Sequence, residues 1–195
     1  MGARDGLRIS AEQVLQNLTV EDARDAFAAI ALANPGGLGR AGEADVREPP
    51  AITLLEAMRL AQHRDRIAWN YTHAFPDVFR RGRPLLLALE ARGWPPGWAV
   101  SGLFMALLAR LPDSHVARRQ GPAAALALRR RVRPLARRLL AAGRPADLAD
   151  ELLALDAALK QERINPGTTA DLVVASCFAL RLAGRGATPT ALLDP

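Results

Sequence analysis

Three segments of the sequence combine glycine or proline with acidic, hydroxyl and basic side chains, the types that bind phosphate and divalent metal ions. The last of them, residues 165–171, reads Asn-Pro-Gly-Thr-Thr-Ala-Asp and precedes an apolar run. Its spacing from Thr168 to Asp171 is typical of a capped helix start. Unpaired N–H groups beside Thr168, Thr169 and the Asp171 carboxylate could hold phosphate, or phosphate with a metal ion. An ordinary buried helix start has the same spacing, so both interpretations stand.

A second segment, residues 112–121, places a carboxylate, an imidazole and two guanidinium groups close together. These belong to Asp113, His115, Arg118 and Arg119, with Ser114 between the first two. Such a set could bind a metal ion and phosphate at the same time. The alternative is a turn in which Asp113 caps a helix and the arginines are solvated.

The first segment in the chain, residues 34–45, is rich in glycine and ends in acidic residues. Gly36 and Gly37 allow the backbone N–H groups to approach a ligand closely. Glu43 and Asp45 could bind a cation. A flexible linker between helices is the alternative interpretation.

The elements that must position these segments are predicted to be helices throughout. Hydrophobic residues make up 50% of the chain and aromatic residues only 5%, so the core must consist of Leu, Ala, Val and Ile. No stretch alternates with period two for long enough to form a strand. We expect an all-α, single multi-helix domain over residues 1–195, whose Gly/Pro-rich loops form the site. The expected helices cover about residues 10–17, 20–33, 53–79, 84–92, 96–111, 122–142, 145–163 and 169–183, with caps at Ser10, Thr19 and Thr53. The last helix is apolar nearly all round, which suggests burial at the centre.

Basic residues outnumber acidic ones by 26 to 20, which favours an anionic ligand or partner. Arg129, Arg133 and Arg137 recur at i, i+4 and i+8 and therefore share one face of a helix. A polyanion could bind there, but we favour a solvated face, and nucleic acid is unlikely, since no aromatic residues interleave to stack on bases. The lone Cys177 fits a reducing compartment, and neither a membrane span nor a secretory signal is apparent. We therefore expect a cytoplasmic protein.

The three segments, in this order, resemble the triphosphoribosyl-dephospho-CoA synthase family. Residues 166–172 are similar to that family's Pro-Gly-x-x-Ala-Asp-Leu motif, and residues 113–118 lie where it has an acid, a small polar residue and a basic pair. Residues 34–43 match its Pro-Gly-rich acidic loop, and residues 54–58 and 64–68 fit its framework. Family members are usually longer, with N-terminal Lys-Pro-Gly and Asn-Thr-x-x-Gly loops that this sequence lacks. The chain thus resembles the C-terminal two-thirds of the family pattern.

The resemblance implies an all-helical enzyme that transfers the triphosphoribosyl group of ATP to dephospho-CoA and releases adenine. It implies Mg²⁺ bound with ATP, while the wording of the loops leaves a related acceptor open. A non-catalytic nucleotide-binding remnant or regulatory subunit is the alternative, and a homo-oligomer or an N-terminal partner is also compatible. By this resemblance, the catalytic candidates are Glu43 and Asp45, the metal ligands are Asp113 and Asp171, and the phosphate or nucleotide ligands are Gly36, Gly37, His115, Arg118, Arg119, Gly167, Thr168 and Thr169.

Overall fold

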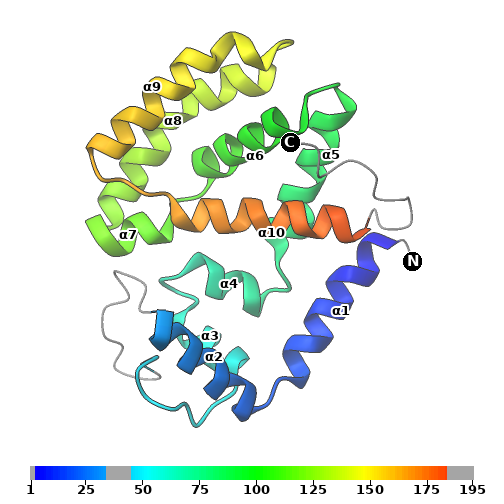
Figure 1. Cartoon of the computed structure of the whole chain (residues 1–195), viewed down its shortest axis with the longest axis vertical. Coiled ribbons are helices and arrows are strands. Elements are labelled where there is room, and N and C mark those ends of the chain that lie inside the picture. Colours follow the sequence, from blue (N-terminus) through cyan, green and yellow to red (C-terminus); the bar gives the residue numbers. More distant parts are fainter. Residues whose placement is uncertain (1–2, 34–44, 184–195) are drawn as a thin grey trace.

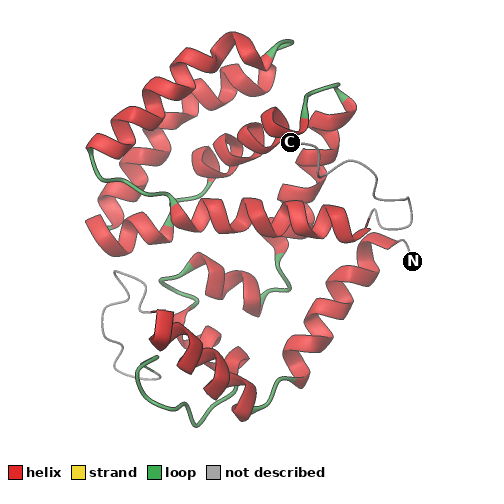
Figure 2. Cartoon of the chain, in the orientation of Figure 1, coloured by secondary structure: helices red, strands yellow, loops and turns green. Residues whose placement is uncertain are grey.

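A computed structural model describes residues 3–33 and 45–183 of the chain, and every regular element in them is a helix (Figure 2). The expectation of an all-helical fold is confirmed. The α-helices are α1 (Ala3–Asn17), α2 (Val20–Ala33), α3 (Leu54–Ala61), α4 (Arg66–Thr72), α5 (Arg83–Ala91), α6 (Pro96–Arg110), α7 (Ser114–Gln120), α8 (Pro122–Ala141), α9 (Ala149–Gln161) and α10 (Gly167–Ala183). A π-helix, η1 (Asp77–Gly82), precedes α5, and a 3₁₀ helix, η2 (Pro145–Leu148), precedes α9.

The last helix, α10, runs through the middle of the molecule (Figure 1). It contacts α5, α6, α7 and η1 on one side and α1 and α4 on another. Leu172, Val173 and Ala179 are buried in the main core, whereas Val174 and Phe178 are more than 60% exposed. Helix α10 therefore lies at the centre, as expected, although one of its faces has no helix packed over it in the described part of the chain.

Two of the three predicted helix caps are present. Thr19 and Thr53 each begin a reciprocal capping arrangement, in which the carboxylate three residues later accepts the backbone N–H of the threonine. The cap at Ser10 is wrong, because α1 already starts at Ala3 and includes this serine.

The single long helix expected over residues 53–79 is wrong. The Asp65 carboxylate accepts the N–H groups of Ile67 and Ala68 and so starts a separate helix, α4. After α4 the chain turns through Ala74 and Phe75, both with positive φ (56° and 52°), before η1 begins. Residues 114–120, expected as a loop, form α7. The remaining boundaries agree with the expectation to within a few residues. No helix in the described residues is long and apolar enough to cross a membrane.

Candidate active site

A buried carboxylate, that of Asp113, joins the N-termini of α7 and α10. Its Oδ1 accepts the N–H of Val116 at 3.0 Å, which caps α7. Its Oδ2 accepts both the N–H and the hydroxyl of Thr169 at 2.8 Å each. Asp113 is 1% exposed. The positive end of α10 is thus already satisfied by an anion of the protein itself, which fixes this helix start against α7.

Hydroxyl groups connect the same two helices to α4. The Ser114 and Thr168 hydroxyls lie 2.8 Å apart, and Thr168 Oγ1 also accepts the N–H of His115 at 3.0 Å. Ser114 Oγ in turn accepts the N–H of Arg66, the first residue of α4, at 3.1 Å. Three helix N-termini, far apart in the sequence, therefore meet at one point. The side chains of Thr168 and Thr169 are buried inside this junction, and their role as phosphate ligands stays a prediction.

The Asp171 carboxylate lies on the exposed side of the junction. Partial burial raises its pKa, the negative charges of Asp113 and Asp65 raise it further, and His115 opposes the shift. No hydrogen bond from any described residue reaches the Asp171 oxygens. Of the two predicted metal ligands, Asp113 thus accepts three hydrogen bonds within the helix junction and Asp171 accepts none from the described residues; both assignments stay predictions.

Basic groups lie beside these carboxylates. The Arg118 guanidinium donates to Asp65 Oδ2 at 3.1 Å and lies 3.2 Å from His115 Nδ1. Because a guanidinium can only donate, Nδ1 accepts, which places the proton of a neutral His115 on Nε2. This Nε2 is buried without a hydrogen-bond partner in the described part of the chain. A Cβ on Gly167 would lie 3.2 Å from the His115 ring, so the absence of a side chain at Gly167 leaves room for the imidazole.

The first glycine-rich segment reaches the same region through its last residue. Asp45 lines a cavity of about 560 Å³ together with Asp65 and Arg118. The other candidates in that segment, Gly36, Gly37 and Glu43, lie outside the described residues. The structure thus brings together the second and third segments, and the described end of the first.

Arg119 does not share this location with Arg118. It lines a different, mainly apolar cavity of about 850 Å³ between α6, α9 and α10. Its assignment as a phosphate ligand stays a prediction, because Arg119 does not line the cavity of Asp45, Asp65 and Arg118.

Sequence reasoning missed a second buried carboxylate, Asp77, at the start of η1. It is fully buried and accepts two hydrogen bonds from Arg66, at 2.7 and 3.0 Å, one from Asn70 at 2.8 Å and one from Arg81. Burial on its own would raise the pKa of Asp77, but the Arg66 and Asn70 hydrogen bonds and the two arginine charges together lower it. The spacing of Arg66 and Asn70, four residues apart, indicates that they share one face of a helix. The sequence does not reveal the turn that brings Asp77 back to that face.

Comparison with known proteins identifies the family. A curated relative named "Probable 2-(5''-triphosphoribosyl)-3'-dephosphocoenzyme-A synthase", from Stutzerimonas stutzeri (strain A1501), is 34% identical over 119 residues. This match covers 60% of the present chain and 40% of the relative. No solved structure matches the chain. Residues 1–189 match the CitG family, described as ATP:dephospho-CoA triphosphoribosyl transferase, and the chain belongs to that family.

Proposed function

We propose that this protein transfers the triphosphoribosyl group of ATP to dephospho-CoA, or to a related acceptor, and releases adenine. The observation that supports the proposal is the convergence of the α4, α7 and α10 N-termini with Asp65, Asp171 and Arg118, in a chain of this family. Carboxylates and a guanidinium beside one helix junction suit a ligand that carries phosphate and a cation. ATP and dephospho-CoA are cytoplasmic metabolites, so a cytoplasmic location belongs to the proposal.

The chemistry breaks the bond between ribose C1′ and adenine N9 and forms one between C1′ and an acceptor hydroxyl oxygen. Positive charge develops on the ribose ring in the transition state, as in glycoside hydrolysis. A carboxylate takes the proton of the attacking hydroxyl, and the leaving adenine gains a proton. Asp45 or Glu43 is the proposed proton acceptor; Asp45 lines the cavity that Asp65 and Arg118 also line.

Magnesium fits this donor set as a companion of the nucleotide. The described residues contain no group of three or more His, Cys, Asp or Glu side chains able to hold a metal ion by themselves. Mg²⁺ usually needs only one or two carboxylates because the substrate phosphates supply further oxygen ligands. Asp171 would hold the ion, which would neutralise phosphate charge.

The deciding experiment measures adenine. The purified chain is incubated with ATP, MgCl₂ and dephospho-CoA, and free adenine and the nucleotide product are separated by chromatography. We expect both to form in equal amounts, and Asp171→Asn to abolish both without changing the far-ultraviolet circular dichroism spectrum. If ATP with MgCl₂ raises the melting temperature but no adenine forms with any acceptor offered, the chain is a nucleotide-binding protein and the proposal fails.

A further inference from the structure

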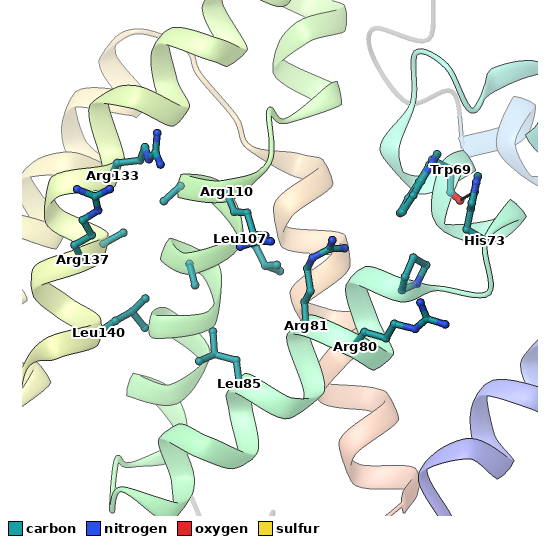
Figure 3. A pocket seen from close by; sticks show the side chains of 14 residues that line it. Trp69, His73, Arg80, Arg81, Leu85, Leu107, Arg110, Arg133, Arg137 and Leu140 are labelled. Carbon is teal, nitrogen blue, oxygen red and sulfur yellow. Dashed lines mark hydrogen bonds between the residues drawn. The ribbon is translucent and has the colours of Figure 1, made fainter.

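A third cavity, of about 860 Å³, lies between η1, α6, α8 and α4 and is lined by five arginines (Figure 3). Arg133 and Arg137 come from α8 and form one wall, opposite Trp69 and His73 of α4. Arg110 of α6 and Arg80 and Arg81 of η1 complete the basic set. The remaining lining is mostly apolar and includes Leu107, Ala136 and Leu140. The volume falls in the range of sites that enclose a nucleotide-sized ligand.

Four of the five arginines in this cavity have no acidic partner in the described part of the protein. No Asp or Glu belongs to its lining, and only Arg81 has an acidic partner, Asp77, which it shares with Arg66. The same helix α8 shows that pairing is available elsewhere: Arg131 contacts Glu162 at 2.7 Å and Arg138 contacts Glu151 at 2.5 Å. Two arginines of α8, Arg131 and Arg138, are thus paired with glutamates, whereas Arg133 and Arg137 line the cavity without an acidic partner among the described residues.

Clustering unpaired arginines has a cost that an anionic ligand would relieve. Arg133 and Arg137 stand four residues apart, a spacing at which like charges destabilise a helix. Their guanidinium groups, with that of Arg110, present forked N–H donors that match phosphate oxygens in pairs. Several guanidinium groups around one cavity match a ligand with several consecutive phosphates better than a ligand with a single phosphate.

The backbone beside the cavity is unusual as well. Pro76 belongs to the lining and directly follows the turn at Ala74 and Phe75. Arg80 and Arg81 also belong to the lining and lie in the π-helix η1. Two consecutive non-glycine residues with positive φ, Ala74 and Phe75, are energetically unfavourable, and such geometry and single π-helical turns are concentrated at functional sites. The turn thus brings Pro76, Arg80 and Arg81 to the wall of the cavity.

We propose that the arginine-lined cavity binds the polyphosphate chain of a nucleotide-type substrate. The identity of that substrate rests on the proposed function, which offers two sources of the same chemistry: the triphosphate of ATP and the diphosphate of dephospho-CoA. Helix α4 links the cavity to the candidate active site, because Asp65 caps its start and Trp69, one turn later, lines the cavity. The two positions are about 6 Å apart along the helix axis.

The test uses inorganic tripolyphosphate as a probe, with the full chain and no MgCl₂, by isothermal titration calorimetry. We expect saturable binding that weakens as NaCl is raised, and a loss of about tenfold or more in Arg133→Ala/Arg137→Ala. Arg130→Ala is the matched control, since Arg130 is an exposed arginine of α8 outside the cavity lining; its affinity should stay within about twofold of wild type. Because both cavity arginines are exposed, the double variant should melt at the wild-type temperature or above it.

Competition then identifies the source of the phosphate. Displacement of tripolyphosphate by ATP alone assigns the cavity to the donor, and displacement by dephospho-CoA alone assigns it to the acceptor. Equal loss of affinity in the Arg130→Ala control, or tighter binding of a single-stranded oligonucleotide than of either nucleotide, would overturn the proposal. The outcome is separable from the proposed function. If tripolyphosphate binds but no adenine is released, the cavity assignment holds and the proposed function fails. If adenine release is unchanged in the double variant, the proposed function holds and the cavity assignment fails.

Discussion

Replacing Asp113 tests whether its carboxylate is a structural link or a metal ligand. In Asp113→Ala, three donors lose their acceptor: the N–H of Val116 and the N–H and hydroxyl of Thr169. Each backbone N–H that stays buried and unpaired costs about 1–3 kcal/mol, and loss of the α7 cap belongs to that figure. The Thr169 hydroxyl can rotate toward another acceptor and adds less. We expect a loss of about 3–5 kcal/mol, a large part of the 5–15 kcal/mol typical of a folded domain.

The milder variant Asp113→Asn keeps the measurement interpretable if the alanine variant does not fold. Its amide oxygen can retain one or two of the three hydrogen bonds, so a loss of about 1–3 kcal/mol is expected. Urea unfolding followed by circular dichroism at neutral pH gives both values. Asp156→Ala is the control, because Asp156 forms only an exposed ion pair with Lys160, which is worth about 0–1 kcal/mol.

The metal-ligand interpretation of Asp113 makes the opposite forecast. If Asp113→Asn unfolds within about 0.5 kcal/mol of wild type but no longer gains stability from ATP with MgCl₂, the carboxylate serves the ligand, and the structural reasoning is refuted. If the variant is destabilised yet still gains stability from ATP with MgCl₂, Asp113 positions α10 and the cation is held by other residues.

Three further substitutions have outcomes that follow from neighbouring contacts. Asp171→Asn should leave the free energy of unfolding unchanged or slightly higher, because it removes the repulsion from Asp113 that raises the pKa of Asp171; a clear loss in urea unfolding would contradict this. Asp77→Asn should cost about 1–3 kcal/mol at pH 7, because the partly exposed guanidinium groups of Arg66 and Arg81 lose their buried carboxylate partner. The folded-state pKa of Asp77 is lowered, so the stability it contributes is complete above the unfolded-state value of about 3.9 and is lost as the pH falls through the folded-state value; the gap between the two proteins in urea unfolding should therefore shrink below about pH 4, and a pH-independent gap would exclude the ion pairs as its cause. Gly82→Ala should cost about 1–3 kcal/mol, because its Cβ would lie 2.0 Å from Ser176 Oγ and 2.7 Å from Ser176 Cβ; in a Ser176→Gly background the same change should cost less, and an equal cost in both backgrounds would show that the close approach of η1 to α10 is not responsible.

Local signals in the sequence predict most of the helices. A threonine followed three residues later by an acidic residue marks the starts of α2 and α3, and those two caps are formed within four consecutive residues. The turn after α4 is different, because alanine and phenylalanine have no preference for the positive φ that Ala74 and Phe75 adopt. Contacts of Asp77 with Arg66 and Asn70 impose that geometry, and they form only when the chain is folded. Sequence spacing therefore predicted one long helix, whereas the local Asp65 cap starts a separate α4 and the contacts of Asp77 set η1 apart from it.

The candidate site shows the same division between local and distant information. Asp113 is a recognisable N-cap of the next helix, but its second oxygen caps a helix that starts more than fifty residues later. Spacing within either segment could not reveal that one carboxylate serves both, and so it offered Asp113 and the two threonines as ligand-binding groups.

The arginines of α8 have the same helix propensity but different neighbours in the folded chain. Helical periodicity places Arg133 and Arg137 on one face but says nothing about what lies opposite. Arg131 and Arg138 meet glutamates, Glu162 and Glu151, around the turn and on the helix that follow α8, so their charges are neutralised by the protein. Arg133 and Arg137 instead meet a cavity whose other walls come from residues 69–110 and carry further arginines. A solvated face was the reasonable expectation from sequence, since surface arginines need no partner. Arginines from α6, α8 and η1 that line one cavity differ from a solvated face, because they can donate to the oxygens of a single anion together.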